Sequence, residues 1–441
     1  MDVQELDTVK IAVIAPTGAG KTALISTVCD FIRESKASNK AKGYCFDIKD
    51  IVAEDAADFA TALDGKLAAK NLDFNSALIP GSRECAEYTF SIKFTDKNTG
   101  LTIEQPFCVL DIPGAFINNP DSYKNNSEYD KFIDHLDNSR ILWIPIDAPV
   151  LMECNTDTQK GYSRVLRRRD NLKRFAKEWA EFAAENNVTD YCNFVLVKCE
   201  SYFSKDSSGQ FNYCKNRFDE EYKSVVDTIR SVNQEDKIAC VAVETIGAVK
   251  VNTSGWKSDG NLSVKYVVEE TERHIRGAEY LLKDVLKVAK ANVEMEVEKR
   301  KAQKANQALG LKNDLQRIIA DQMAKIEGMK VQESSLSYKI EQLDTAKRDR
   351  SNKGVWDMIM NWFDGNIDDL DSKIRNLNSH IKSIRAAIAD EQRKLDALQL
   401  SQTAKEGELD AVEQEIIGLN KLGELFDTLS VSGSSPYYRP L

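Results

Sequence analysis

The strongest constraint on the fold is a glycine-containing turn that follows the first apolar run of the chain. Val9–Ile14 is almost entirely apolar, which is the pattern of a strand buried on both faces. It leads directly into Ala15-Pro-Thr-Gly-Ala-Gly-Lys-Thr22, and a helix is predicted from Lys21 to about Arg33. A buried strand, a glycine-rich turn and a helix in this order predict a phosphate-binding loop.

This segment meets the Walker A pattern, except that Ala15 replaces the first glycine. Gly18 and Gly20 allow backbone N–H groups to converge on phosphate oxygens. Lys21 is expected to reach the terminal phosphates of a nucleotide, and Thr22 is expected to bind Mg²⁺. The predicted nucleotide-binding residues are Ala15, Pro16, Thr17, Gly18, Ala19, Gly20, Lys21, Thr22 and Ala23.

A carboxylate follows a second apolar strand. Asp111 comes directly after the predicted strand Ile103–Leu110 and opens an Asp-x-x-Gly sequence that ends at Gly114. At the carboxyl end of a strand beside the first one, Asp111 would hold Mg²⁺ through a water molecule. The Gly114 amide would sense the γ-phosphate and draw the following loop into place. The competing interpretation is an ordinary aspartate in a turn.

Strands and helices alternate along the following part of the chain. The predicted strands are Ile141–Ile144, stopped by Pro145, then Phe194–Val197 and Ile238–Val243, and the predicted helices are about Tyr162–Glu185 and Asp219–Ser231. This alternation predicts right-handed crossovers and a doubly wound, mostly parallel α/β sheet. Two hairpins are also expected: an antiparallel edge pair, Glu87–Phe94 with Ile103–Leu110, and an extra pair, Val249–Val251 with Leu262–Val268.

The C-terminal part of the chain has a different pattern. From about residue 278 to 428, apolar residues recur at alternating three- and four-residue steps, which predicts a heptad seam. Turn signals at Ser351–Gly354 and Asp364–Asn366 divide this seam into two helices of similar length. We therefore predict an antiparallel α-helical coiled-coil hairpin after an α/β domain over residues 1–277, with a flexible tail over 429–441.

The turn between the two helices is unusually apolar. Val355–Phe363 contains two tryptophans, two methionines, an isoleucine and a phenylalanine. Such a patch is costly to expose. Three interpretations stay open: the side chains close the hairpin end or dock against another copy, they bind a partner protein, or they contact a membrane surface.

Composition limits the partners and the compartment. The formal net charge of −10 argues against broad attraction to nucleic acid, and no nucleic acid is expected as a partner. The nine cysteines form no Cys-x-x-Cys pair and several lie in apolar strands, as expected of reduced thiols. The first ten residues do not resemble a signal peptide. A cytoplasmic protein is the expectation.

These motifs together resemble the TRAFAC class of P-loop GTPases over about residues 7–250. The resemblance rests on Gly20-Lys21-Thr22, Asp111-x-x-Gly114 and Lys198 after an apolar strand. It implies GTP and Mg²⁺ as cofactors and GTP hydrolysis as the activity, with ATP as the alternative nucleotide. In this family an Asn/Thr-Lys-x-Asp motif recognises guanine; the corresponding residues are Val197-Lys198-Cys199-Glu200, so Glu200 replaces the aspartate.

The resemblance implies further site residues. Thr245 lies in a segment placed like the last base-contacting loop of the family, and Ser82 is the best candidate for the hydroxyl that binds Mg²⁺ in the triphosphate state. Thr61, Ser76 and Thr89 are alternatives to Ser82. Many relatives carry a water-orienting glutamine after the Asp-x-x-Gly motif, where this chain has Ala115 and Phe116. Hydrolysis would then depend on another group, on a partner, or on self-association.

Three functions follow from these features. The leading one is a GTP-hydrolysing switch or mechanoenzyme that couples nucleotide state to the helical stalk, to a partner or to self-assembly. Its layout is similar to dynamin-like proteins, and bacterial conflict systems contain GTPases with similar motifs fused to helical modules. The second is a coiled-coil ATPase, although nothing catalytic follows Leu419. The third is a nucleotide-binding structural or adaptor protein without turnover.

Overall fold

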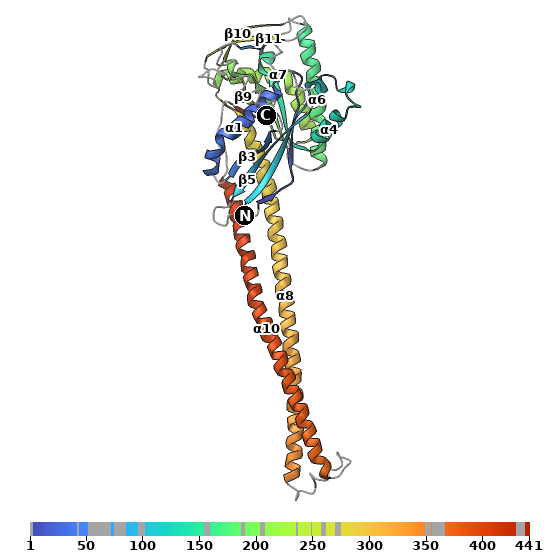
Figure 1. Cartoon of the computed structure of the whole chain (residues 1–441). Helices are drawn as coiled ribbons and strands as arrows, with labels where there is room; N and C mark the ends of the chain where they lie inside the picture. The colour runs from blue at the N-terminus through green and yellow to red at the C-terminus, as the bar shows by residue number, and fades with distance from the viewer. Residues whose placement is uncertain are drawn as a thin grey trace. The chain divides into compact units, whose positions relative to one another are not determined.

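The computed structural model of the chain resolves two compact units (Figure 1). The first unit comprises Met1–Val297 together with Asn420–Leu441, and the second comprises Glu298–Leu419. The structure describes residues 3–41, 44–51, 72–74, 85–95, 102–153, 159–186, 190–202, 208–234, 237–247, 249–256, 262–269, 275–348, 354, 367–428 and 437–441. The predicted boundary at Gly277 falls at the start of a helix whose first turns belong to the first unit.

A mixed, mostly parallel sheet forms the centre of the first unit, which confirms the predicted α/β class. Within the described residues its strand order is β12-β9-β8-β7-β2-β6-β5-β3. Strands β9, β8, β7, β2 and β6 run parallel, whereas β5, β3 and β12 are antiparallel to their neighbours. The bounds are β2 Val9–Val13, β3 Tyr44–Ile51, β5 Ala86–Thr95, β6 Thr102–Asp111, β7 Ser139–Asp147, β8 Tyr191–Val197, β9 Lys237–Val243 and β12 Tyr438–Pro440.

Two shorter pairings complete the strands. Strand β1 (Val3–Glu5) pairs in parallel with the first residues of β6, on the same edge that β2 uses further along. A separate antiparallel sheet joins β10 (Val249–Trp256), β11 (Leu262–Val268) and β4 (Leu72–Phe74). The predicted β5–β6 hairpin is present, but β3 pairs along the outer side of β5, so the hairpin is not the edge of the sheet.

Strand β7 is longer than the sequence predicted. Pro145 was expected to stop it, but the strand continues to Asp147. The pairing of β7 with β2 ends at Trp143. Pro145 therefore needs no N–H group for a hydrogen bond to β2, and its described partner is Val195 of β8. Asp147 is therefore the last residue of β7, at the carboxyl end of the strand.

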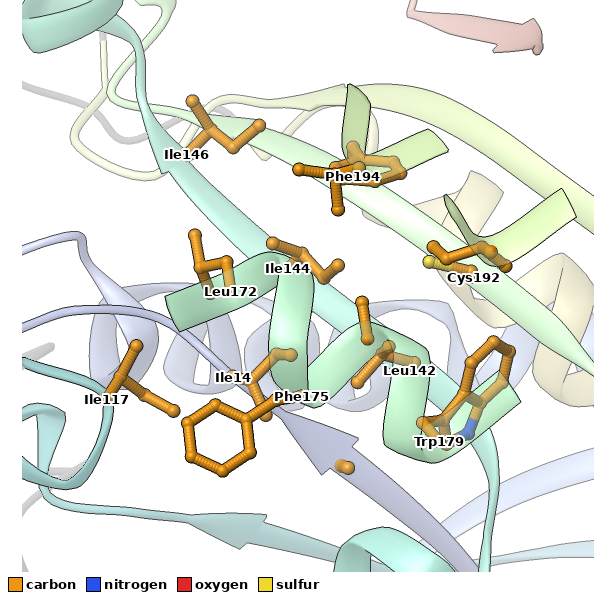
Figure 2. Packing of buried hydrophobic residues seen from close by; sticks show 14 of the residues in the cluster. Ile14, Ile117, Leu142, Ile144, Ile146, Leu172, Phe175, Trp179, Cys192 and Phe194 are labelled. Atoms are coloured by element: carbon orange, nitrogen blue, oxygen red, sulfur yellow. The ribbon is translucent and has the colours of Figure 1, made fainter. Parts of the chain in front are cut away.

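One face of the sheet is covered by helices rich in aromatic residues. Ile144 of β7 and Phe194 of β8 alternate with residues that point to the opposite face, and they pack against Phe175 and Trp179 of α6 (Figure 2). The Trp179 indole donates a hydrogen bond to the Ser139 carbonyl oxygen at 2.8 Å. The helices that contribute to this cluster are α3 Gly114–Asn118, α4 Ser127–Asp137, α5 Ala148–Glu153, α6 Gln159–Glu185 and α7 Ser208–Val232.

The first turns of α8 (Ala278–Arg348) belong to the sheet domain. Their apolar residues are buried, among them Leu281, Val285 and Val293. Asn193 of β8 donates to the Asp284 carboxylate at 3.1 Å, and Asn292 donates to Gln105 of β6 at 3.0 Å. Because Asn193 alternates with Phe194 along β8, this part of α8 lies on the face opposite α6.

The last residues of the chain form a strand, which corrects the predicted tail over 429–441 for its final part. Strand β12 pairs with Ala239–Val241 of β9. Main-chain hydrogen bonds of 2.9 Å from Ala242 to Tyr437 and from Leu441 to Ile238 hold it in place. A three-residue strand held by backbone bonds leaves no hydrophobic periodicity in the sequence. Residues 429–436 lie outside the described ranges.

The second unit contains two long helices in antiparallel contact. Lys325 of α8 bonds Glu391 of α10 (Ile367–Thr428) at 2.7 Å, and Arg385 bonds Glu333 at 2.6 Å. Residue numbers that rise along α8 therefore meet numbers that fall along α10. Ile326, Leu343, Ile381 and Leu395 are buried between them. The apolar turn predicted over 355–363 lies outside the described residues.

The remaining described helices of the first unit are α1 Lys21–Ala41, which lies beside β3, and the short turns η1 Pro120–Ser122 and η2 Glu200–Tyr202 (Figure 1). Within the part of the chain that the structure describes, no helix is both long and apolar enough to cross a membrane.

We predict that Gly277→Ala destabilises the first unit by about 3 kcal/mol or more. Gly277 has a φ of +87°, and an added Cβ would lie 1.9 Å from the Ala242 carbonyl oxygen. Urea denaturation should show a lower midpoint at an unchanged slope. The control is Gly255→Ala, where an added Cβ meets nothing within 4 Å. An equal midpoint for both variants would contradict the prediction.

Candidate functional site

The predicted phosphate-binding loop lies between the end of β2 and the start of α1. Gly18 and Gly20 adopt positive φ values of 81° and 97°, which glycine reaches without strain. An added Cβ on Gly20 would lie 3.1 Å from a Val197 methyl group, so this glycine also allows β8 to approach closely. The loop begins with Ile14 donating to the Trp143 carbonyl oxygen at 3.0 Å. These contacts hold its backbone between β2 and the neighbouring strands.

Lys21 lies inside the loop rather than in solvent. Its side chain is buried, and Nζ donates to the Ala15 carbonyl oxygen at 3.1 Å. Burial lowers the pKa of Lys21, and the nearby Asp111 carboxylate opposes that shift. A buried cation with one backbone acceptor is prepared to receive an anion, because a phosphate oxygen would supply a further acceptor and a compensating charge.

Thr22 and Asp111 form the candidate metal site. The Thr22 hydroxyl donates to Asp111 Oδ2 at 2.8 Å, and Asp111 is buried. The parallel register that places Val13 opposite Asp111 brings the two residues together. A hydroxyl and a carboxylate fit Mg²⁺, which is bound in such sites by one or two protein oxygens together with phosphates and waters. Within the described residues, no group of three or more His, Cys, Asp or Glu side chains forms an all-protein metal site.

Gly114 lies against the phosphate-binding loop. A Cβ on Gly114 would fall 2.3 Å from the Thr17 nitrogen and 2.5 Å from Thr17 Cα. Only glycine allows the two backbones to approach this closely. The residues after Asp111 therefore contact the loop directly, and the predicted response of Gly114 to a γ-phosphate stays a prediction.

Two asparagines that the sequence did not single out hold this contact. Asn118, the last residue of α3, donates from Nδ2 to the Thr17 hydroxyl at 3.1 Å. Asn171 of α6 donates to the Ile117 and Asn118 carbonyl oxygens at 2.6 and 3.2 Å. No local motif marks either residue, since Asn171 and α3 are more than fifty residues apart in the chain.

Lys198 connects β8 to the phosphate-binding loop. It has a positive φ of 57°, and its Nζ donates to the Gly18 carbonyl oxygen at 2.9 Å and to Asp147 Oδ2 at 2.6 Å. Asp147 also accepts from the Val150 amide at 3.1 Å through Oδ1. Sequence reasoning missed Asp147, because the predicted strand ended at Ile144. The carboxylate fixes the direction in which the Lys198 side chain extends.

Thr245 lies beside Lys198. Its hydroxyl accepts a hydrogen bond from the Lys198 amide at 3.1 Å, and the residue is fully buried. The segment that follows β9 is thereby tied to the segment that follows β8. The two candidate base-contacting segments are thus joined by a hydrogen bond.

Glu200 has an orientation that the sequence did not predict. It is buried, and its Oε1 accepts from the Ile246 amide and from the Gly247 amide, the latter at 3.4 Å. Burial raises the pKa of Glu200 to about 7, and the backbone hydrogen bonds partly oppose the shift. The carboxylate thus holds the Thr245–Gly247 segment through its main-chain amides. Its predicted contact with guanine stays a prediction.

The remaining candidates divide into two groups. Ser82, Ser76 and Thr61 lie outside the described residues, and Thr89 lies within β5, paired with Cys108 of β6. Phe116, which stands where the family resemblance predicts a water-orienting glutamine, is buried against Tyr129 with ring centroids 5.5 Å apart. Its side chain therefore belongs to the core.

Comparisons with known proteins add little to this geometry. No protein-family model matches the chain, and no curated protein matches its sequence. Among solved structures, the chain is similar to the signal recognition particle receptor SRb-GTP/SRX complex from Chaetomium thermophilum, at 12% identity and a TM-score of 0.30. That match covers 54% of this chain and 94% of the other. A TM-score this low carries no weight for fold or function.

We predict that Glu200→Gln flattens the pH dependence of stability. The folded-state pKa of about 7 lies above the ordinary value of 4.5, so folded protein keeps the proton over a range in which unfolded protein has lost it. The contribution of Glu200 is therefore most favourable below about pH 4.5 and is lost as the pH rises through about 7. Its full size is roughly 3 kcal/mol.

Urea denaturation of wild type and Glu200→Gln between pH 4.5 and 8 measures this difference. The free energy of unfolding of wild type relative to the variant should fall as the pH rises. A difference that is independent of pH would show that Glu200 titrates in its ordinary range.

Proposed function

We propose that this protein is a Mg²⁺-dependent GTPase of the cytoplasm that couples its nucleotide state to the two long helices. The observation that carries the proposal is the convergence of three strands on one loop. Thr22 meets Asp111 of β6 at 2.8 Å, and Lys198, which directly follows β8, meets Gly18 at 2.9 Å. Phosphate, metal and base functions would thus be assembled around a single glycine-containing loop.

The proposed roles follow from the contacts. Lys21 would bind the terminal phosphates, with the loop amides from Thr17 to Ala23 around them, and Thr22 and Asp111 would hold Mg²⁺. The metal would supply charge neutralisation at the β- and γ-phosphates. Gly114 would respond to the γ-phosphate, because its backbone lies in contact with Thr17.

Guanine is the proposed base. The aliphatic part of Lys198 packs over Gly20, with Cε 3.5 Å from an added Cβ, so its stem could also cover the face of a base. Glu200 would exchange its hydrogen bond to Ile246 or Gly247 for bonds to guanine. Adenine lacks the adjacent ring N–H and amino group that a carboxylate can bind together in guanine. GTP is therefore the proposed nucleotide, and ATP is the alternative.

The coupling proposal rests on Glu244, which directly precedes Thr245. The Glu244 carboxylate accepts from the Tyr437 hydroxyl at 2.9 Å and lies 3.9 Å from the Arg276 guanidinium. Its amide donates to the Arg276 carbonyl oxygen at 3.0 Å. Arg276 comes just before α8, and Tyr437 comes after α10. The segments at which the chain enters and leaves the long helices thus both contact the candidate base loop.

A second contact joins the same two segments. The rings of Tyr280, in the first turn of α8, and Tyr438 of β12 stack with centroids 5.6 Å apart, and Lys283 Nζ lies 5.6 Å from the Tyr438 centroid. A change in the Glu244–Thr245 segment on nucleotide binding would therefore reach both segments at once. The coiled-coil hairpin would then act as a dynamin-like stalk, through self-association or a partner protein.

A nucleotide-binding adaptor without turnover is the second candidate function. The observation in its favour is the burial of Phe116, which leaves no water-orienting side chain directly after Gly114. It predicts nucleotide binding with no release of phosphate, even at high protein concentration.

We expect purified protein to bind a fluorescent GTP analogue in the presence of Mg²⁺. Unlabelled GTP should displace the analogue at lower concentration than unlabelled ATP does. Lys21→Ala should weaken GTP binding by about 10- to 100-fold, the value of a hydrogen bond to a charged group. Asp111→Ala should reduce the dependence on Mg²⁺. The control is Lys177→Ala, an exposed lysine of α6 paired with Glu181. Stronger displacement by ATP would favour a coiled-coil ATPase.

We expect Tyr437→Phe to disconnect the C-terminal strand from the nucleotide site. Hydrogen exchange should show that GTP slows exchange of the amides of Tyr437–Leu441 in wild type. The variant should lose this effect and keep protection of the phosphate-binding loop, because the hydroxyl that bonds Glu244 is removed and the loop is unchanged. Tyr438→Phe retains the ring stack and is the control. Equal nucleotide responses in both variants would contradict the coupling.

A further inference from the structure

An unsatisfied side-chain oxygen lies beside the phosphate-binding loop. Asn118 donates through Nδ2 to the Thr17 hydroxyl, whereas its Oδ1 is buried and has no hydrogen-bond partner within the described residues. A buried amide oxygen without a partner costs free energy and calls for a bound water or ligand. The orphaned acceptor would gain a hydrogen bond if a small shift of the neighbouring backbone admitted a water molecule beside it.

The contact of Asn118 with Thr17 places its side chain beside the predicted phosphate-binding loop. Thr22 and Asp111 mark the metal end of the loop, and Gly114 contacts Thr17 at the same edge. Asn118 follows Gly114 by one helical turn and reaches Thr17 itself. The segment from Asp111 to Asn118 would thus line the γ-phosphate.

The surroundings of Asn118 hold it firmly. Its neighbour Ile117 is fully buried, and Asn171 of α6 binds the carbonyl oxygens of both residues. The hydrogen bond to the Thr17 hydroxyl limits the rotation of the Asn118 amide. A group fixed in this way loses little entropy when it orders a water molecule.

We propose that Asn118 orients the attacking water in GTP hydrolysis and that the Thr17 hydroxyl positions its amide. This inference rests on the proposed function. Oδ1 would accept a hydrogen bond from the water, whose oxygen forms a bond to the γ-phosphorus as the bond to the bridging oxygen breaks. The electron pair stays on the GDP β-phosphate, and the proton of the water passes to the phosphate product. The amide takes no proton and acts by orientation.

Asn118→Ala should lower the single-turnover rate of GTP hydrolysis by about 100-fold, the usual cost of a misplaced reactant. The Kd for GTP should change little, because the bonds from Asn171 go to main-chain carbonyls and persist in the variant. Thr17→Val should also slow hydrolysis, and Thr17→Ser, which keeps the hydroxyl, should lose less of the rate than Thr17→Val. Asn119→Ala, at the exposed neighbouring asparagine, is the control.

Binding of GDP with aluminium fluoride and Mg²⁺ gives a second readout, because this complex mimics the transferring phosphoryl group with its attacking water. Asn118→Ala should bind it at least about tenfold more weakly than wild type and bind GDP alone equally well. Hydrolysis by Asn118→Ala at the wild-type rate would overturn the inference. So would parallel losses of GTP binding, melting temperature and rate, which would assign Asn118 a purely structural role.

The failure of the inference is distinct from failure of the proposed function. Wild-type protein that hydrolyses GTP, with Asn118→Ala hydrolysing it at the same rate, would overturn the role of Asn118 and leave the proposed function intact. Wild-type protein that binds neither GTP nor ATP, with Lys21→Ala indistinguishable from it, would overturn the proposed function itself.

Discussion

The parallel pairing of β2 with β6 is the interaction on which the site depends. It places Val13 opposite Asp111, so the phosphate-binding loop and the carboxylate leave the sheet at the same level. The hydrogen bond from Thr22 to Asp111 and the close approach of Gly114 to Thr17 both follow from this register. A shift of one residue would turn Asp111 to the opposite face of the sheet and remove both contacts.

Three ionisable side chains are buried at the edge of this sheet, although burial of a charge costs free energy. Lys21, Asp111 and Glu200 are each buried, and burial lowers the pKa of Lys21 and raises that of Glu200. Each of these side chains has at least one hydrogen bond, which limits the cost. These buried groups are only partly compensated by their hydrogen bonds, and a phosphate, a metal ion and a base would supply the missing interactions. Affinity for a nucleotide would then come from completing these partial bonds rather than from creating a pocket.

Both ends of the long helices lead back to this sheet. The start of α8 packs on the face opposite α6 through Leu281 and Val285, and β12 extends the sheet beyond β9. Glu244 links the two segments at the edge where Thr245 meets Lys198. The helical part of the chain is therefore an insertion between two segments of one domain rather than an appendage joined by a single linker.

The sequence by itself determined the α/β class, the glycine-containing turn between β2 and α1, and the proximity of Asp111 to that turn. These depend on local patterns: apolar runs, glycines with positive φ, and the rule that parallel strands end at one edge. Only the tertiary structure revealed Asn118, Asp147 and the contact of Tyr437 with Glu244. Each of these joins residues far apart in the chain, and hydrogen bonds between single polar side chains leave no periodic signal. The inward orientation of Glu200 was decided in the same way, because its partners are backbone amides that any sequence would supply.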